Sequence, residues 1–229
     1  MRTLKHYFFT AALLGLFFTA CKEQKAEDKT GESAAQDSME VTETEATAST
    51  AVLNVNLATE ADLEAAGLSA DLIAGIMEKK PLLSMNELDQ MLGDEVNKEE
   101  LYKKMFIPLN LNTTAEADFK MIPGVGDRMA HEFEEYRPYT SVAQFKREIG
   151  KYVDEEEVAR YLNYVYVPVE LNTASEEDIK ALPGVGDRMA HEFEEYRPYK
   201  NMEQFRAEIG KYVDEKELAR LEKLVYLKE

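Results

Sequence analysis

The last quarter of the chain carries apolar residues at helical spacing in short runs. One run falls at positions i, i+1, i+4 and i+7, which places its members on one side of a helix. These residues are Met189, Ala190, Phe193 and Tyr196. A further helix is predicted from about Met202 to Glu208; Gly210 breaks it, and Asp214 is suited to cap the next helix. The apolar face of that last helix is Leu218, Leu221, Leu224 and Val225. Apart from short apolar stretches such as residues 165–167, no alternating run is long enough to predict a strand, so the pattern indicates an all-α fold.

The residues that precede Met189 predict one more helix and a tight turn. Thr173 and Glu176 have the spacing of a capping box, which marks a helix start. That helix is predicted to end just before Pro183, because proline disfavours the helical conformation in the residue that precedes it. Gly184 and Gly186 then allow a reversal with positive φ. The sequence thus predicts four short helices in residues 171–229.

The same unit occurs more than once. Residues 123–139 recur without a change as residues 183–199, and residues 148–155 recur as residues 208–215, both at an offset of 60. An earlier, more divergent copy keeps an asparagine, a proline and a glycine at matching positions: Asn56, Pro81 and Gly93. We therefore expect tandem units of about 60 residues at 53–110, 111–170 and 171–229, each small enough to bury surface against its neighbours.

The N-terminus has the features of an export signal. Arg2 and Lys5 precede an apolar run that ends at Ala20, and the run is too short for a comfortable membrane span. It leads into Phe-Thr-Ala-Cys at 18–21, which resembles the bacterial lipobox. We expect a lipoprotein signal peptide at 1–20 and lipidation of Cys21; an ordinary signal peptide and an uncleaved anchor are the alternatives. No aspartate follows Cys21 to retain the protein in the inner membrane, so an outer-membrane anchor is expected, facing either side.

Composition distinguishes an N-terminal linker from the part of the chain that is expected to fold. Cys21 is the only cysteine, which excludes a disulfide framework and a cysteine-based zinc site. Residues 21–52 are mostly Glu, Ala, Thr, Ser, Lys and Asp and are expected to form a disordered acidic linker. The formal net charge is −18, and it becomes −20 once Arg2 and Lys5 are removed. Such a charge works against non-specific attraction to nucleic acid and to anionic lipid.

Two whole units, 111–229, resemble a known family, and the first unit resembles it weakly. The resemblance rests on Leu-Asn-Thr-Ala-Ser at 171–175, Pro-Gly-Val-Gly at 183–186 and a helix ending in Tyr196-Arg197. This order resembles the helix-hairpin-helix repeat of the competence protein ComEA and is similar to a module of a minor pseudopilin of type II secretion. The resemblance implies an all-α fold of tandem helix-hairpin-helix repeats.

The resemblance also implies DNA binding through the sugar-phosphate backbone without base readout. A glycine hairpin presents backbone N–H groups at a helix start, where a phosphate is stabilised. Carried over to this chain, the phosphate-binding residues are Gly124, Val125, Gly126, Arg128, Gly184, Val185, Gly186 and Arg188. The backbones of the glycines and valines would donate, and the arginines would supply charge.

Several residues depart from the DNA-binding pattern. Asp127 and Asp187 follow the hairpins directly, where the family tends to have lysines, and their carboxylates could cap the same N–H groups. The next helix also presents Glu132, Glu134 and Glu135, repeated as Glu192, Glu194 and Glu195. Residues 171–229 hold 10 Lys and Arg against 14 Asp and Glu, a net of −4. A protein-interaction or scaffold role in an outer-membrane or secretion complex, with purely structural hairpins, is therefore the alternative.

The remaining hairpins are weaker matches. The second hairpin of the middle unit, at residues 149–152, has one glycine where the family commonly has two. The first unit has Ala-Gly-Leu-Ser at 66–69 in place of the signature, which indicates a structural role.

No catalytic or cofactor motif is apparent. His131 and Glu132 lack the second histidine of a metalloprotease helix, so a metal site is not expected. Gly124 and Gly126 lack the third glycine and the preceding strand of a dinucleotide site. Tyrosines at 136, 139, 196 and 199 could stack on bases, although their spacing favours packing. We expect a non-enzymatic envelope lipoprotein without a cofactor, whose partners are DNA or an envelope protein, and the membrane through Cys21.

Overall fold

The computed structural model describes residues 52–94 and 96–228. Within these ranges it contains twelve helices and six strands of two residues each. The predicted signal peptide 1–20, the predicted lipidation of Cys21, and all of the linker 21–52 except Val52 lie outside the described residues. None of the helices between residues 52 and 228 has the length and apolar character needed to span a bilayer.

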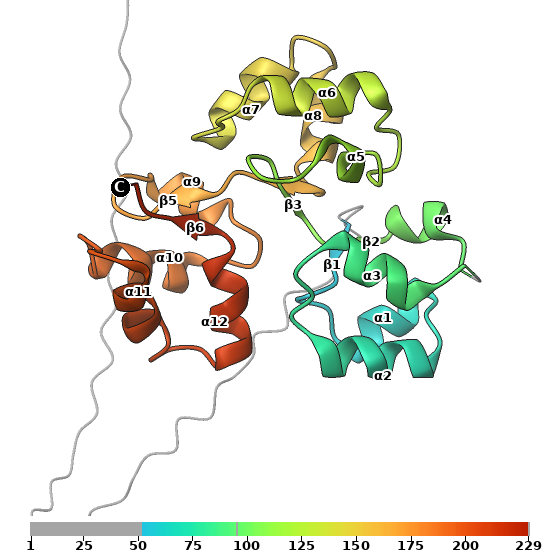
Figure 1. Ribbon diagram of the computed structural model, residues 1–229, viewed down its shortest axis with the longest axis horizontal. Helices are drawn as coiled ribbons and strands as arrows, with labels where there is room; N and C mark the ends of the chain where they lie inside the picture. The colour runs from blue at the N-terminus through green and yellow to red at the C-terminus, as the bar shows by residue number, and fades with distance from the viewer. Residues whose placement is uncertain (1–51, 95, 229) are drawn as a thin grey trace, which may run out of the picture. The chain divides into compact units, whose positions relative to one another are not determined.

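The fold is all-α, as the hydrophobic pattern predicts, and it consists of three successive groups of four short helices (Figure 1). The first repeat contains β1 (Leu53–Asn54), α1 (Glu60–Ala66), α2 (Ala70–Lys79), α3 (Met85–Leu92), α4 (Lys98–Tyr102) and β2 (Met105–Phe106). The second contains β3 (Leu109–Asn110), α5 (Glu116–Phe119), α6 (Asp127–Glu135), α7 (Val142–Ile149), α8 (Glu155–Tyr161) and β4 (Val165–Tyr166). The third contains β5 (Val169–Glu170), α9 (Glu176–Lys180), α10 (Asp187–Glu195), α11 (Met202–Ile209), α12 (Glu215–Glu222) and β6 (Val225–Tyr226).

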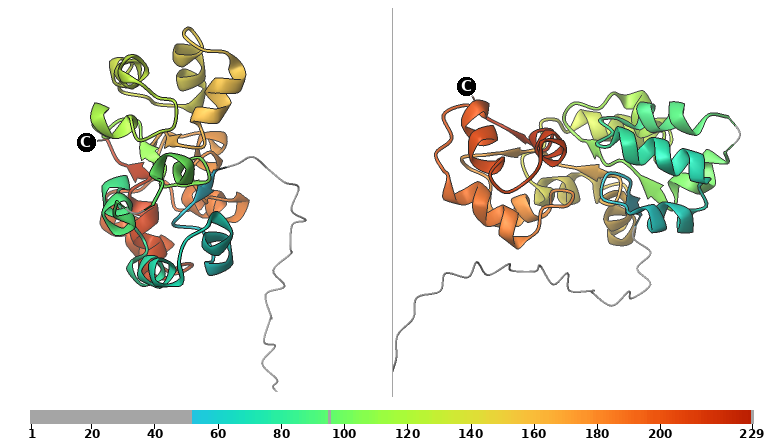
Figure 2. Two further views of the ribbon diagram at one scale, coloured as in Figure 1. Left: turned by 90° about the vertical axis from the view of Figure 1, so that its right-hand side faces the viewer. Right: turned by 90° about the horizontal axis from the view of Figure 1, so that it is seen from below.

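A pair of parallel strands closes each repeat, a feature that the hydrophobic pattern does not predict. β1 pairs with β2, β3 with β4, and β5 with β6. In the third repeat the Val169 N–H donates to the Leu224 carbonyl and the Leu171 N–H to the Tyr226 carbonyl, both at 3.0 Å. Two residues give no period to detect in a sequence. The pairing joins the beginning of each repeat to its own end, and Figure 2, right, shows the third repeat as one such group, coloured orange to red.

The helix boundaries lie close to the predicted ones, with one change of capping residue. Ser175, and not Thr173, caps α9: its hydroxyl accepts from the Asp178 N–H at 3.1 Å. The Thr173 hydroxyl instead donates to Glu170 at 2.6 Å, within the turn that follows β5. The predicted cap of the last helix is confirmed, because the Asp214 carboxylate caps α12. Leu224 and Val225, which were predicted on the apolar face of this helix, lie beyond its end at Glu222, and Val225 belongs to β6.

The predicted stripe of α10 faces the core of its repeat. Ala190 and Phe193 are fully buried, while Met189 and Tyr196 are partly buried at the edge. The Phe193 ring meets Phe205 of α11 at a centroid distance of 5.2 Å in an edge-to-face contact. Aromatic rings therefore join the second and third helices of the repeat, and Phe133 and Phe145 make the equivalent contact in the second repeat.

One asparagine per repeat ties the segment after the first strand to the start of the third helix. The Asn172 side-chain amide donates to the Tyr199 carbonyl at 2.9 Å, and its carbonyl accepts from the Tyr199 N–H at 2.7 Å. Asn112 bonds Tyr139 in the same way, as does Asn56 with Leu82. This contact explains why the asparagine recurs in all three repeats.

We expect Asn172→Ala to lower the free energy of unfolding by about 2 kcal/mol, because it removes two hydrogen bonds and leaves backbone groups unpaired. Urea denaturation followed by circular dichroism measures the change. Asn86→Ala is the matched control: its amide makes one exposed bond of 3.4 Å to Asp118, so a change within about 0.5 kcal/mol is expected. Equal losses in the two variants would contradict a special role for Asn172.

Candidate nucleic-acid interface

A tight turn connects α5 to α6 and, in the third repeat, α9 to α10. Gly124 and Gly184 have φ values of 81° and 72°, a left-handed conformation that side chains rarely adopt. Val125, one residue on, is 6 % exposed and packs into the core. The turn therefore holds the next residue, Gly126 or Gly186, at the N-cap of the following helix.

Those two helices begin without a side-chain cap. Nine of the twelve helices in the described ranges have an N-cap side chain that accepts from a first-turn N–H. The exceptions are the four-residue α5 and the two hairpin helices α6 and α10. In α6 the first intrahelical bond runs from the Ala130 N–H to the Gly126 carbonyl. The N–H groups before Ala130 thus lack an acceptor in their own helix and point out of its N-terminus.

The first repeat differs at this position. Its α2 is capped by Ser69, whose hydroxyl accepts from the Leu72 N–H in a long bond of 3.5 Å. The serine replaces the glycine that stands at positions 126 and 186. The helix that lost the Pro-Gly-Val-Gly signature therefore uses its own side chain where the other two leave N–H groups open.

Packing does not explain the glycine at the N-cap of α6. Gly126 has φ −96° and ψ −178°, an extended conformation open to any residue. A Cβ atom built on Gly126 would meet nothing within 4 Å, and the same holds for Gly186. Both glycines are exposed. Their lack of a side chain leaves the helix start accessible from outside, the property that a backbone-to-phosphate contact requires.

The valines are not available as donors, contrary to the sequence-based expectation. The Val125 N–H donates to the Ile122 carbonyl at 3.0 Å, and the Val185 N–H donates to the Leu182 carbonyl at 3.1 Å. These bonds close the turn and could not be anticipated from the residue types. The remaining predicted residues are exposed: Gly124, Gly126, Arg128, Gly184, Gly186 and Arg188.

Asp127 does not cap its helix. Its carboxylate is turned to Lys120 of the preceding segment, with 2.5 Å between Oδ1 and Nζ, and Asp187 pairs with Lys180 at 2.8 Å. The hydrogen bond from Lys120 holds the pKa of Asp127 below its usual range. The carboxylate therefore stays charged and neutralises a lysine while the helix start remains open. The two lysines were missed from the sequence, although they stand at the same distance before the aspartate in both repeats.

The glutamates of α6 do not form a free acidic face. Glu132 is 8 % exposed, so the prediction that it lies on the exposed side of the helix is wrong. Glu134 forms an ion pair with Arg137 at 3.0 Å, and Glu135 lies 4.0 Å from the exposed His131 ring. In the third repeat Glu192 is equally buried, and Glu194 pairs with Arg197. One glutamate of each hairpin helix thus pairs with an arginine and another is buried, so the three do not act as a single exposed acidic face.

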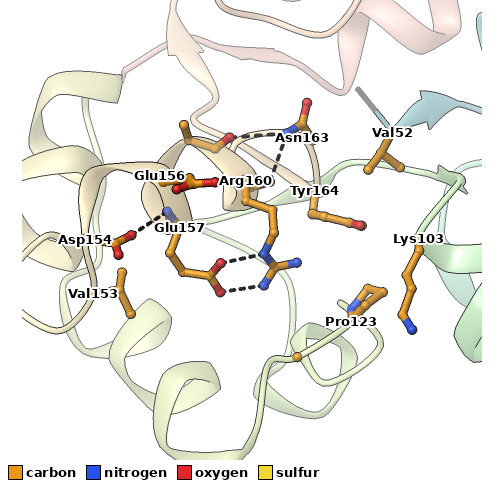
Figure 3. A pocket seen from close by; sticks show the side chains of 12 residues that line it. Val52, Lys103, Pro123, Val153, Asp154, Glu156, Glu157, Arg160, Asn163 and Tyr164 are labelled. Atoms are coloured by element: carbon orange, nitrogen blue, oxygen red, sulfur yellow. Dashed lines mark hydrogen bonds and ion pairs between the residues drawn. The ribbon is translucent and has the colours of Figure 1, made fainter. Parts of the chain in front are cut away.

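Beside the hairpin of the second repeat is an open hollow of about 1130 Å³ (Figure 3). Pro123 and Gly124 line it together with Arg160, Tyr164 and Lys103. The Arg160 guanidinium donates two bonds, of 2.6 and 2.7 Å, to the Glu157 carboxylate, as the dashed lines in Figure 3 show. Arg160 and Lys103 were not selected from the sequence, because nothing local connects them with the hairpin.

In the third repeat the corresponding arginine contacts the hairpin directly. Arg220, the counterpart of Arg160, donates to the Pro183 carbonyl at 2.5 Å, and its side chain is 6 % exposed against 33 % for Arg160. A Cβ atom on Gly184 would lie 2.8 Å from a methyl carbon of Leu57. Two hairpins of identical sequence therefore have different surroundings.

Residues that could bind a metal do not gather in the described ranges, where no group of three or more His, Cys, Asp or Glu side chains lies together. The His131 ring is 65 % exposed, and its Nδ1 lies 3.8 Å from Glu116.

Comparison with known proteins gives one match. Residues 165–225, nearly the whole third repeat, match a family model described as a helix-hairpin-helix motif. No curated protein and no solved structure matches the chain. The chain therefore contains a helix-hairpin-helix motif in its third repeat, and the second repeat carries the same hairpin residue for residue. Such a motif is compatible with non-specific nucleic-acid binding and with a structural role.

We expect the two glycines of one hairpin to differ in their tolerance of a side chain. Gly124→Ala should lower the free energy of unfolding by about 1–2 kcal/mol, because its φ is positive. Gly126→Ala should change it by no more than about 0.5 kcal/mol, since the methyl group meets no atom. Urea denaturation of both variants measures the difference. A large loss in Gly126→Ala would mean that packing, and not access, requires this glycine.

Proposed function

We propose that this protein binds DNA without sequence preference, through phosphates at the starts of α6 and α10, and that it catalyses no reaction. The observation that carries the proposal is the pair of exposed, glycine-flanked and uncapped helix N-termini. Unpaired N–H groups and the helix dipole favour an anion at such a position. Phosphate contacts of this kind position a protein on DNA and carry no base information.

The contacts follow from the geometry of each hairpin. The N–H groups of Gly126 and Asp127 donate to phosphate oxygens, and Arg128, exposed in the first turn, supplies positive charge. Gly186, Asp187 and Arg188 do the same in the third repeat. The first repeat, whose α2 is capped by Ser69, contributes to packing and not to binding. With a few phosphates neutralised, the affinity is modest and depends on salt.

We further propose a ComEA-like role in DNA uptake at the outer membrane, with the protein held there by lipid on Cys21. Support comes from the sequence: the charged start, the short apolar run and the cysteine that directly follows it. In this arrangement residues 21–52 hold the repeats away from the bilayer.

A protein partner in the envelope is the second candidate. Two observations favour it: the net charge of −18, and two exposed leucines of the first repeat, Leu57 at 45 % and Leu83 at 52 %. In this case the hairpins serve only to turn the chain between helices.

The test uses the purified full chain in a non-ionic detergent and a fluorescently labelled DNA duplex, with binding measured by anisotropy. We expect the affinity to fall with about the second to fourth power of salt concentration, as a few phosphate contacts require. The double variant Gly126→Val with Gly186→Val should weaken binding about tenfold or more, because the new side chains cover the N–H groups.

The matched control is Ser69→Val, which changes the N-cap of α2 in the first repeat. It should leave DNA affinity unchanged although it removes a cap. Absence of binding at low salt would refute the DNA function and leave the protein partner. If the control lost as much DNA affinity as the double variant, the loss would be due to impaired folding and not to the hairpins.

Anchoring by lipid is tested separately. We expect Cys21→Ala to move the protein from the membrane fraction to the soluble fraction of its host, since the only site for the lipid is lost. Immunoblotting of the two fractions measures the distribution, and wild type that is soluble from the outset would contradict the anchor. Persistence of the variant in the membrane would indicate an uncleaved apolar segment.

A further inference from the structure

Each hairpin repeat carries a hydrogen-bonded pair of tyrosines that the hairpin function does not require. The Tyr136 and Tyr152 hydroxyl oxygens lie 2.7 Å apart, and those of Tyr196 and Tyr212 lie 2.7 Å apart as well. The ring centroids are 6.3 and 6.4 Å apart, with the ring planes tilted by about 50°. The hydroxyl bond fixes both rings of a pair, so little conformational freedom remains to be lost when something packs against them.

The pairs begin next to the open helix starts. The Arg128 guanidinium, in the first turn of α6, lies over the Tyr152 ring at 5.8 Å from its centroid. The Lys151 ammonium lies over the Tyr136 ring at 4.7 Å, and Lys211 lies over Tyr196 at 5.1 Å. In the second repeat a cation thus lies over each ring of the pair, and one of the two cations, Arg128, belongs to the first turn of the hairpin helix.

These rings lie at the edge of the core and are not enclosed by it. The core position four residues after the end of each hairpin helix is filled by Tyr139 or Tyr199, which are 0 % and 3 % exposed. Tyr212, by contrast, is 36 % exposed, and Tyr136, Tyr152 and Tyr196 are partly exposed. Of the tyrosines that the sequence offered as candidates for base stacking, Tyr139 and Tyr199 are buried in the core, whereas Tyr136 and Tyr196 are only partly buried.

The ring pair and the open hairpin occur together. In the first repeat, the residue two before the shared proline is Lys79 in place of Tyr136, and Gly75 stands in place of Glu132. This is also the repeat whose hairpin helix is capped by Ser69. The aromatic pair is thus absent from the repeat that offers no open helix start.

Tyr152 and Tyr212 remain neutral phenols. The pKa of Tyr152 lies well above its usual range because of its hydrogen bond to Tyr136 and the nearby Glu132 carboxylate, and the same holds for Tyr212 beside Tyr196 and Glu192. Neither ring repels a phosphate by a charge of its own.

We propose that Tyr152 with Tyr136, and Tyr212 with Tyr196, are stacking platforms for unpaired bases, so that the preferred ligand is single-stranded nucleic acid. The inference rests on the proposed function, because the hairpin binds the phosphate that brings the neighbouring base to the ring. Stacking on aromatic side chains tolerates any base, since every base has a π-face. Duplex bases are stacked on each other and cannot reach the rings, so duplex DNA is bound through phosphates alone.

The test compares three labelled ligands of equal length with the full chain in non-ionic detergent: oligo-dT, an abasic strand with the same phosphates, and a duplex. Wild type should bind oligo-dT about tenfold more tightly than the abasic strand, from stacking of a base at each platform. In the double variant Tyr152→Leu with Tyr212→Leu this preference should disappear, while the affinity for the abasic strand stays the same.

The conservative control is Tyr152→Phe with Tyr212→Phe, which keeps both rings and loses only the hydroxyl bonds. It should retain most of the preference for oligo-dT, and circular dichroism verifies that all variants are folded. Equal binding of oligo-dT and the abasic strand by wild type would overturn the stacking inference and leave the phosphate function intact. Failure of every ligand to bind would instead refute the proposed function itself.

Discussion

Short helices must be held by something other than their own hydrogen bonds, and this constraint governs each repeat. The described helices have four to ten residues, fewer than an isolated helix needs for stability in water. Each repeat therefore joins its first strand to its last and ties the following turn to the third helix through one asparagine. A small aromatic core fills the space between them. Because the scaffold is closed in this way, packing places no demand on the N-cap of the second helix in the last two repeats, where a Cβ atom on Gly126 or Gly186 would meet nothing within 4 Å.

The N-cap of the second helix differs among the three repeats. Side chains satisfy the start of almost every helix, including α2 of the first repeat. The helices α6 and α10 alone combine an exposed glycine at the N-cap with a left-handed glycine two residues earlier. A glycine that neither φ nor packing demands is best explained by something that approaches from outside. The first repeat shows that the same scaffold tolerates a capped helix, so the open start is a property of these two hairpins and not of the fold.

What the sequence predicts well is what depends on neighbouring residues. The stripe of α10, the Gly184 turn and the Asp214 cap follow from local spacing, and all three are present. The errors concern contacts between distant or competing groups. Glu132 was expected on an exposed face, yet it is buried, and its carboxylate lies beside Tyr152, a residue 20 positions further along the chain. Asp127 has two possible partners nearby, the helix N–H groups and Lys120, and only the folded backbone decides between them. The two-residue strands have no period, so no pattern could reveal them.

The net charge of −18 is the strongest physical argument against binding to DNA, and its weight depends on distance. At physiological salt, exposed charges more than about 8–10 Å apart are largely screened from each other. The carboxylates that matter are those beside the helix starts, and there Asp127 pairs with Lys120, Glu134 pairs with Arg137, and Glu132 is buried. A phosphate at Gly126 therefore meets N–H groups and Arg128 before it meets an unpaired carboxylate. The distant acids slow the approach of DNA more than they weaken the bound contact, because long-range fields act chiefly on the encounter.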